Sequence, residues 1–330
     1  LNAKREQSTD VRDAVAGIIA DVTERGDDAL FDLTQKFDRF DARTRGLAIS
    51  EAEVDAACAK VSPETMQALT VAADRIRAFH MRQLPEDIDY TDDAGVRLGQ
   101  AWKPVGAAGL YVPGGLASYP SSVLMNAIPA TVAGAERIVM VVPTPDDVLN
   151  PLVLAAAKLA GVSEIYRIGG AQAVAALAFG TNSIAPVDKI VGPGNAFVAE
   201  AKRQVFGKVG IDSIAGPSEI LVIADNKTNP RWIAADLLSQ AEHDAVAQSI
   251  LITDDAVYAK MVMDAVEDHL ATLARKDIAL ASWRDFGAVI VVPDLNGAVA
   301  LTDRLAPEHL ELAVDDPEAM RCKIKNAGAI

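Results

Sequence analysis

Residues 137–170 read RIVMVVPTPDDVLNPLVLAAAKLAGVSEIYRIGG, and they contain the repeating unit of the fold. An apolar run, RIVMVVP, leads into an Ala-rich helical segment at about 148–160, and a second apolar run, EIYRIGG, follows it. Short β-rich runs that alternate with helices are typical of a parallel sheet covered by helices on both faces. This stretch therefore predicts an α/β fold.

The same alternation continues along the chain. Four further strand-like runs are DKIVGPG, EILVIAD, SILITDD and GAVIVVP. Helices are expected from 171, from 195, before His243, and near 255–273, 296–306 and 316–326. So many strands fit two doubly wound, Rossmann-like sheets better than one sheet.

The N-terminal part has a different texture, because residues 9–80 predict helix after helix. We expect residues 1–110 to join residues 218–330 in a first, discontinuous α/β domain, while residues 111–217 form a second α/β domain. The chain ends in KNAGAI, which predicts a Gly turn followed by the start of a buried strand. A finished domain seldom stops at such a point, so we expect a C-terminal portion to be missing from this sequence.

Composition narrows the class of partner. The chain has 330 residues, half of them hydrophobic, with a formal net charge of -15 and a pI near 4.7. This charge disfavours binding to a nucleic acid or an anionic membrane and favours a small molecule. Two cysteines, Cys58 and Cys322, predict neither a disulfide framework nor a thiolate cluster, which fits a reducing cytoplasm. No segment has the apolar length of a membrane span.

Three Gly-rich turns follow predicted strands: YVPGG (111–115), IGGAQ (168–172) and VGPGN (191–195). Gly lets a backbone approach a phosphate closely, and the amides at a helix N-terminus favour an anion. None of the turns completes G-x-G-x-x-G, so each taken singly is more simply a turn that strand geometry requires. The polar residues at these turns, Tyr111, Gln172 and Asn195, favour a nucleotide-binding hypothesis.

The stretch DLLSQAEHD (236–244) reads as the end of an amphipathic helix whose inward residues are Trp232, Ala235 and Leu238. Gln240 and His243 are three residues apart, so both can face one point, as ligands of a cation such as Zn²⁺ would. The alternative is an imidazole that interacts with the negative end of the helix dipole.

Two further motifs offer polar groups. In AGPSE, Ser218 precedes a strand and either presents its hydroxyl to a cleft or holds its own turn. In RLAPEHLEL, Pro307 is expected to start a helical turn, and Glu308 and His309 supply two proton-transfer groups. The alternative for that pair is an exposed acidic helix cap. The remaining histidines, His80 and His269, lie on charged helical stretches and are expected to be solvated.

Taken in order, these stretches resemble the histidinol dehydrogenase family over essentially the whole chain. The resemblance implies a proton-transfer pair, Glu308 and His309, and zinc ligands, Gln240 and His243. It implies NAD contacts from Tyr111, Gln172 and Asn195, and substrate contacts from Ser218, Gln240, His243 and His309. The first domain would then carry the zinc and the catalytic residues, and the second would contribute the NAD contacts.

The implied activity is the four-electron oxidation of L-histidinol to L-histidine by NAD through an enzyme-bound aldehyde, in a homodimer with one Zn²⁺ per subunit. The family completes its zinc site with an Asp beyond NAGAI and a His from the partner subunit's C-terminal region. Neither residue is present in this sequence. Two alternatives therefore stay open: a zinc-free NAD-dependent dehydrogenase of another amino alcohol, and a catalytically incomplete binding fragment.

Overall fold

The computed structural model describes residues 9–114, 119–214, 216 and 218–330. Its contacts divide the chain into two compact units, one within residues 6–215 and the other within residues 216–330. Among the described helices, none has the length and apolar character that crossing a membrane requires. Gly115 and Pro217, which belong to two of the quoted motifs, lie outside the described residues.

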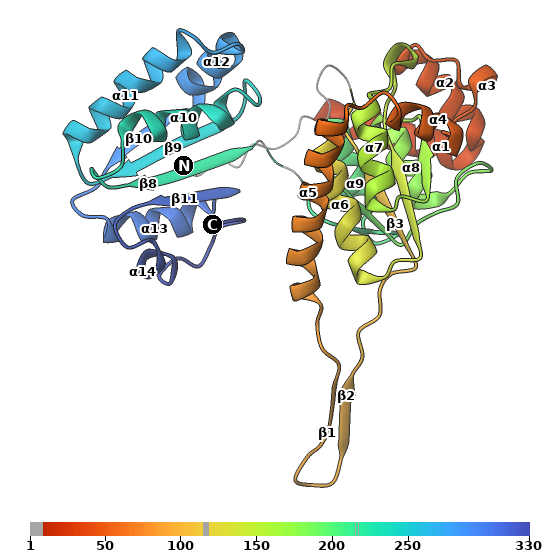
Figure 1. Cartoon of the computed structure of the whole chain (residues 1–330), viewed down its shortest axis with the longest axis horizontal. Coiled ribbons are helices and arrows are strands. Elements are labelled where there is room, and N and C mark those ends of the chain that lie inside the picture. Colours follow the sequence, from red (N-terminus) through yellow and green to blue (C-terminus); the bar gives the residue numbers. More distant parts are fainter. Residues whose placement is uncertain (1–8, 115–118, 215, 217) are drawn as a thin grey trace. The chain divides into compact units, whose positions relative to one another are not determined.

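The first unit is built on a five-stranded parallel sheet with strand order β5-β4-β3-β6-β7 (Figure 1). Its strands are β3 (Ala107–Tyr111), β4 (Arg137–Val141), β5 (Glu164–Tyr166), β6 (Lys189–Val191) and β7 (Gly210–Ile211). The helices that lie between these strands in the sequence are α6 (Pro120–Ala133), η2 (Pro145–Asp147), α7 (Pro151–Ala160), α8 (Gly170–Phe179) and α9 (Ala196–Val205). The predicted alternation of strands and helices is confirmed in this unit.

Both faces of this sheet are buried, as the continuous apolar strands predict. In β4, Val139 and Val141 belong to one core, whereas Ile138 and Met140 belong to the core on the opposite face. The first core contains residues of α8 and α9, and the second contains residues of α6 and α7. Alternate residues of a strand point to opposite faces, so one apolar run supplies both cores.

The N-terminal helices pack in this same unit. They are α1 (Thr9–Arg25), α2 (Asp27–Asp38), α3 (Ala42–Arg45), α4 (Glu51–Cys58), α5 (Pro63–His80) and η1 (Met81–Gln83). Val15 and Val22 of α1 are buried in the core that contains α8 and α9, whereas α4 and α5 complete the opposite core. The expected grouping of residues 1–110 with residues 218–330 therefore differs from the observed contacts. The apolar stripe of α1 predicted a buried face but not the surface that buries it.

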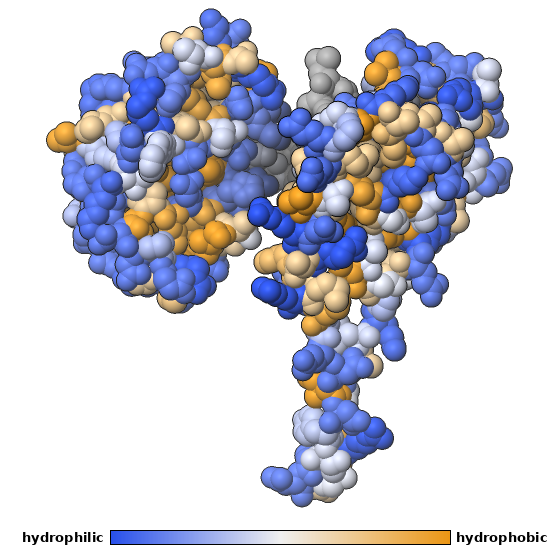
Figure 2. All heavy atoms as spheres, viewed as in Figure 1, coloured by the Kyte–Doolittle hydropathy of each residue, from blue (hydrophilic) through white to orange (hydrophobic). Residues whose placement is uncertain are grey.

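An antiparallel ribbon of β1 (Ile88–Thr91) and β2 (Arg97–Gln100) projects from the first unit (Figure 1). Every residue of both strands is exposed. Figure 2 shows apolar residues among hydrophilic ones along it. The exposed hydrophobic residues of its strands are Ile88, Tyr90 and Leu98. The sequence pattern did not predict a separate hairpin, because neither strand alternates between a buried and a solvated face.

The second unit has a four-stranded parallel sheet with strand order β10-β9-β8-β11. Its strands are β8 (Glu219–Ala224), β9 (Gln248–Thr253), β10 (Ala288–Val291) and β11 (His309–Ala313). One face is covered by α10 (Pro230–Ala241), α11 (Ala256–Leu270) and α12 (Lys276–Phe286), and the other by α13 (Asn296–Leu305) and α14 (Pro317–Arg321) (Figure 1). The prediction of two separate parallel sheets is confirmed.

The expected inward face of α10 is wrong for two residues. Trp232 is 67% exposed and Ala235 is exposed, whereas Leu238 is buried as expected. The buried stripe consists of Ile233, Ala234, Leu237, Leu238 and Ala241. Its aliphatic residues recur at helical spacing over two turns and outweigh the single large aromatic residue.

The expected helical turn at Pro307 is also wrong, because His309 begins β11. The segment around Ala329 pairs with it: Leu310 N–H donates to the Ala329 carbonyl at 2.9 Å, and Ala329 N–H donates to the Glu308 carbonyl at 2.9 Å. These bonds form a parallel bridge between His309 and Ala329, which agrees with the strand start predicted from KNAGAI. Pairing with β8 on one side and this segment on the other holds the Glu308–His309 backbone extended.

Candidate functional site

Five predicted site residues gather at one edge of the four-stranded sheet. Ser218 immediately precedes β8, and Glu308 and His309 lie at the start of β11, which pairs with β8. Because α10 runs back along the parallel sheet, its C-terminal end with Gln240 and His243 lies at the same edge, just before β9. This is the amino edge of the strands, whereas the usual ligand site of such sheets is the carboxyl edge.

The side chains of Glu308 and His309 lie close to each other. Their side chains approach to 3.8 Å between Glu308 Oε1 and His309 Nε2. The other carboxylate oxygen, Oε2, accepts a hydrogen bond of 3.2 Å from Glu219 N–H at the start of β8. Both side chains remain about half exposed, at 51% and 53%. The backbone of β8 therefore orients the carboxylate, while the imidazole stays open to a ligand.

Gln240 and His243 lie on one turn at the end of α10. The helix ends at Ala241, and His243 follows in a turn where its N–H donates to the Gln240 carbonyl at 3.1 Å. The imidazole is exposed and the Gln240 side chain is partly buried. Among the residues that the structure describes, no group of three or more His, Cys, Asp and Glu side chains is placed to hold a metal ion. An amide oxygen and an imidazole nitrogen are suitable zinc donors, but they are only part of a four-ligand shell.

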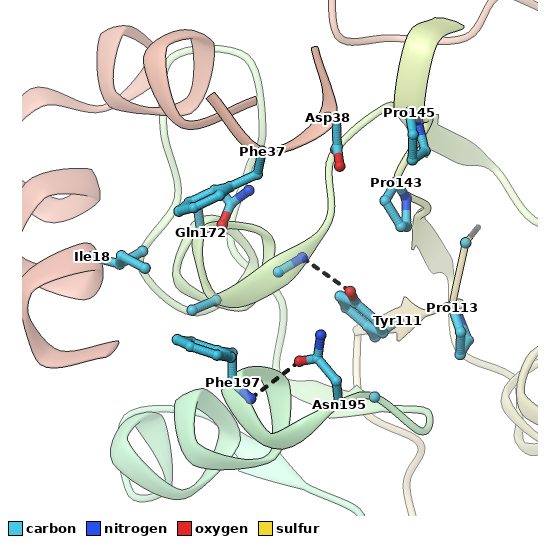
Figure 3. Close-up of a pocket in the computed structure, with 14 residues that line it drawn as sticks. Ile18, Phe37, Asp38, Tyr111, Pro113, Pro143, Pro145, Gln172, Asn195 and Phe197 are labelled. Carbon is cyan, nitrogen blue, oxygen red and sulfur yellow. Dashed lines mark hydrogen bonds between the residues drawn. The ribbon is translucent and has the colours of Figure 1, made fainter. Parts of the chain in front are cut away.

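The other three predicted residues line one cavity in the first unit (Figure 3). Tyr111 ends β3, Gln172 lies in the first turn of α8, and Asn195 caps α9 after β6, around a cavity of about 390 Å³. In the sheet order, β3 leads to β4 on one side and β6 flanks it on the other. The cavity thus lies at the carboxyl edge where the strand order reverses, which is the usual ligand position in open α/β sheets.

Tyr111 joins two of the Gly-rich turns. Its phenol oxygen accepts a hydrogen bond of 2.9 Å from Gly170 N–H at the start of α8. Burial raises the pKa of Tyr111 to about 12, so the phenol keeps its proton and can donate it to a ligand. Gly170 has φ +64°, and a Cβ there would lie 2.7 Å from Gln172 Oε1. Gly is therefore required for the position of the Gln172 amide.

The Asn195 side-chain amide caps a helix with its oxygen and faces the cavity with its nitrogen. Its Oδ1 accepts hydrogen bonds from Phe197 N–H at 3.1 Å and Val198 N–H at 3.2 Å, which caps α9. Its amide nitrogen points into the cavity (Figure 3). The cap restricts the side chain to one orientation, so this donor is already in place before a ligand binds.

Sequence reasoning missed several residues that line this cavity. Phe37 and Asp38, at the end of α2, line the cavity beside Ile18 of α1, and Phe197 of α9 lies across from Phe37 (Figure 3). No motif in the sequence connects α1 and α2 with the Gly-rich turns. The only available signal was an Asp at the C-terminal end of a helix, where the helix dipole disfavours a negative charge.

A second missed feature lies close to the Glu308–His309 pair. Glu311 of β11 forms a side-chain hydrogen bond with Asp236 of α10. Burial, together with the charge of Asp236, raises the pKa of Glu311 to about 7. The folded protein therefore holds a proton between these two carboxyl groups at a pH where an unfolded chain has released it.

In the window from about pH 4.5 to about pH 7, only the folded form binds this proton. The second unit therefore becomes less stable as the pH rises through that window. We expect Glu311→Gln to raise the free energy of unfolding at pH 8 by about 1–2 kcal/mol and to change it little at pH 4.5. Denaturant unfolding at both pH values measures this. The exposed Glu267→Gln control should change neither value, and equal effects of Glu311→Gln at both pH values would contradict the assignment.

Two parallel sheets, with polar side chains gathered at a strand edge of each, are typical of the α/β class of enzymes. A family model for histidinol dehydrogenase matches residues 1–330. The chain therefore belongs to the histidinol dehydrogenase family, and it is an oxidoreductase.

Individual relatives agree with this membership. Histidinol dehydrogenase of Rhodospirillum rubrum is 66% identical over 331 residues, which cover 100% of this chain and 76% of the relative. The protein of the same name from Rhizobium meliloti is 65% identical over 330 residues, again with 100% and 76% covered. The crystal structure of histidinol dehydrogenase from Elizabethkingia anophelis superposes with a TM-score of 0.94 at 39% identity, and covers 98% of this chain and 75% of that one.

Proposed function

We propose that this protein oxidises L-histidinol to L-histidine with NAD as hydride acceptor and Zn²⁺ as the bound metal, in the last two steps of histidine biosynthesis. Histidinol is the substrate that the names of its relatives state. The observation that carries the proposal is the cavity where Tyr111, Gln172 and Asn195, distant in sequence, come together. All three are the residues for which the family resemblance implies NAD contacts.

The cavity suits an adenine nucleotide. Its lining combines aromatic and proline side chains with a few polar groups, a combination typical of cofactor sites. Gln172 and Asn195 supply amide groups, and Tyr111 supplies a hydroxyl donor. The N-terminal end of α8 begins at Gly170, in the cavity lining, where backbone amides favour a phosphate.

Glu308 and His309 would carry the proton transfers. In the first oxidation, His309 accepts the hydroxyl proton of the alcohol while hydride leaves the carbon for NAD, which produces the aldehyde. Glu308 then accepts a proton from the water that adds to the aldehyde carbon. In the second oxidation, His309, which has released the first proton to solvent, accepts a proton from the hydrate as the second hydride passes to a second NAD⁺, which produces the acid. Ser218, at the same sheet edge, would bind the alcohol.

Gln240 and His243 would hold Zn²⁺, and their donor types fit it. When bound, the metal would orient the substrate through the imidazole and amine of the substrate. Gln240 and His243 would thus belong to the substrate site, together with His309. The remaining ligands would be an Asp that follows Ile330 in the family and a His from the partner subunit, so we propose a homodimer. Cys58 and Cys322 are both free thiols, which supports placing the enzyme in the cytoplasm.

Mixing the complete gene product with histidinol, NAD⁺ and Zn²⁺ should produce NADH, followed by its absorbance. In that assay, we expect Gln172→Ala to raise the KM for NAD about tenfold, because the lost amide hydrogen bonds act mainly in dinucleotide binding. The exposed Gln67→Ala on α5 is the control and should leave the KM unchanged. A folded gene product that forms no NADH from histidinol would refute the proposed function.

A further inference from the structure

Among the described residues that line the cavity, Asp38 is the one with a carboxyl group. Only 8% of this residue is exposed, and its carboxyl group points toward the cavity (Figure 3). Its Oδ2 is buried and has no hydrogen-bond partner among the described residues. A buried carboxyl oxygen without a partner is unfavourable, so its presence at this position requires a reason.

The local structure makes a negative charge at Asp38 more unfavourable still. Asp38 is the last residue of α2, where the helix dipole repels an anion. Burial raises its pKa, and the adjacent Arg39 only partly opposes that effect. The Arg39 guanidinium donates to both carboxylate oxygens of Asp146 instead, with Nε to Oδ1 at 2.7 Å. Among the described residues, no cation is therefore paired with Asp38, which is unusual for a structural carboxylate.

The surroundings of Asp38 indicate which part of a nucleotide it would meet. Phe37 and Phe197 lie on opposite sides of one end of the cavity, and Ile18 closes that end (Figure 3). Both rings are substantially exposed, at 47% and 41%, although they are large and apolar. A flat base between two aromatic rings would cover both of them. Asp38 directly follows Phe37, so it lies where the sugar attached to that base would begin.

The other direction from Asp38 leads to the phosphate-binding elements. Asp38 is close enough to Tyr111 for its charge to contribute to the raised pKa of the phenol. Tyr111 in turn contacts Gly170 N–H at the start of α8. The order along the cavity is thus aromatic rings, carboxyl group, phenol and helix N-terminus, which matches base, ribose and phosphate.

We propose that Asp38 selects NAD over NADP by accepting hydrogen bonds from the adenosine ribose hydroxyls and excluding a 2′-phosphate. This inference rests on the proposed use of a dinucleotide by this cavity. The ribose hydroxyls would give the carboxylate the hydrogen bonds that its Oδ2 lacks among the described residues. A 2′-phosphate would instead place a second anion beside a carboxylate with which no described cation is paired. The selecting carboxylate comes from an N-terminal helix instead of from the sheet that holds the cavity, where such fingerprints usually place it.

The test is isothermal titration of NAD⁺ and NADP⁺ into the wild type and Asp38→Asn, with Asp93→Asn as control. Asp93 is an exposed carboxylate at the turn of the β1–β2 ribbon, so its substitution makes the same chemical change away from the cavity. We expect Asp38→Asn to weaken NAD⁺ binding about 10- to 100-fold, because hydrogen bonds to a charged acceptor are lost. NADP⁺ binding should stay unchanged or become tighter.

Thermal unfolding without ligand separates this role from a structural one. Replacing a carboxylate that has a structural role lowers the stability of the fold. Replacing a carboxylate that has no paired cation and lies at a helix C-terminus should raise it. We expect Asp38→Asn to raise the Tm of the free protein by about 2–4 °C. AMP and its 2′-phosphorylated analogue, used as smaller probes, should show the same discrimination as the dinucleotides if it resides in the adenosine half.

The possible failures are distinct. A wild type that binds NAD⁺ and NADP⁺ equally overturns the role of Asp38 and leaves the proposed function intact. The role of Asp38 is also overturned if Asp38→Asn changes the NAD⁺ and NADP⁺ affinities by the same factor. It is likewise overturned if the substitution lowers the Tm without changing the ratio of the two affinities. A folded wild type that binds neither dinucleotide overturns the proposed dinucleotide site and this inference together.

Discussion

His309→Asn should lower kcat for histidinol oxidation by about 10²- to 10⁴-fold, the range that removal of a general base produces. Asn fills a similar space and can still donate and accept hydrogen bonds, but it does not accept a proton near neutral pH. His309 begins a strand whose register with β8 is set by backbone hydrogen bonds, so the substitution should not disturb the fold. The measurement is steady-state NADH formation by the complete gene product.

The expected loss is specific to turnover. NAD affinity should stay within about twofold of the wild type, because every described residue that lines the proposed dinucleotide cavity belongs to the first unit. His80→Asn is the matched control, since His80 is a partly exposed histidine that contacts Gln83 through Nδ1 at 2.6 Å. Near-normal turnover in His309→Asn would rule out His309 as the proton acceptor.

His243→Ala should abolish tight zinc binding, and with it most of the activity. Removing one of the four proposed ligands would leave the cation incompletely coordinated, and the His243 imidazole would be the stronger of the two donors proposed for this chain. Gln240→Ala should weaken zinc binding less, because a neutral amide oxygen is the weaker donor. Metal content after dialysis, measured by mass spectrometry on the complete gene product, gives the zinc-to-protein ratio for each variant.

His269→Ala is the control for this series. His269 lies on α11 and its Nε2 contacts the Arg231 carbonyl at 3.0 Å, so this contact already explains its position. Zinc retained at the wild-type ratio in both His243→Ala and Gln240→Ala would refute their role as ligands. A wild type that is fully active after zinc removal would support the alternative of a zinc-free dehydrogenase of an amino alcohol.

Some structural features were predictable because they depend on short-range patterns. The run RIVMVVP predicted β4, and its apolar residues on both faces predicted helices on both sides of the sheet. The Gly-rich turns predicted strand ends correctly for the same reason: Gly170 adopts a positive φ that side chains rarely tolerate.

The errors came from places where local signals compete. Trp232 favoured one face of α10, yet the aliphatic stripe around Leu237 determined which face is buried. Pro307 is compatible with either a helix start or an extended segment, and pairing with β8 and Ala329 selected the extended form. Such pairing depends on partners far away in sequence.

The sequence by itself determined the α/β class, the two parallel sheets, and the motifs that identify the family, since apolar periodicity and turn residues are local properties. Only the tertiary structure decided that the N-terminal helices complete the core around the five-stranded sheet and bring Phe37 and Asp38 beside Tyr111. It also decided that Glu308, His309 and His243 share the amino edge of the other sheet. An apolar face can be buried by any complementary surface, so the choice of partner, and the polar groups that it brings together, depends on packing of the whole chain.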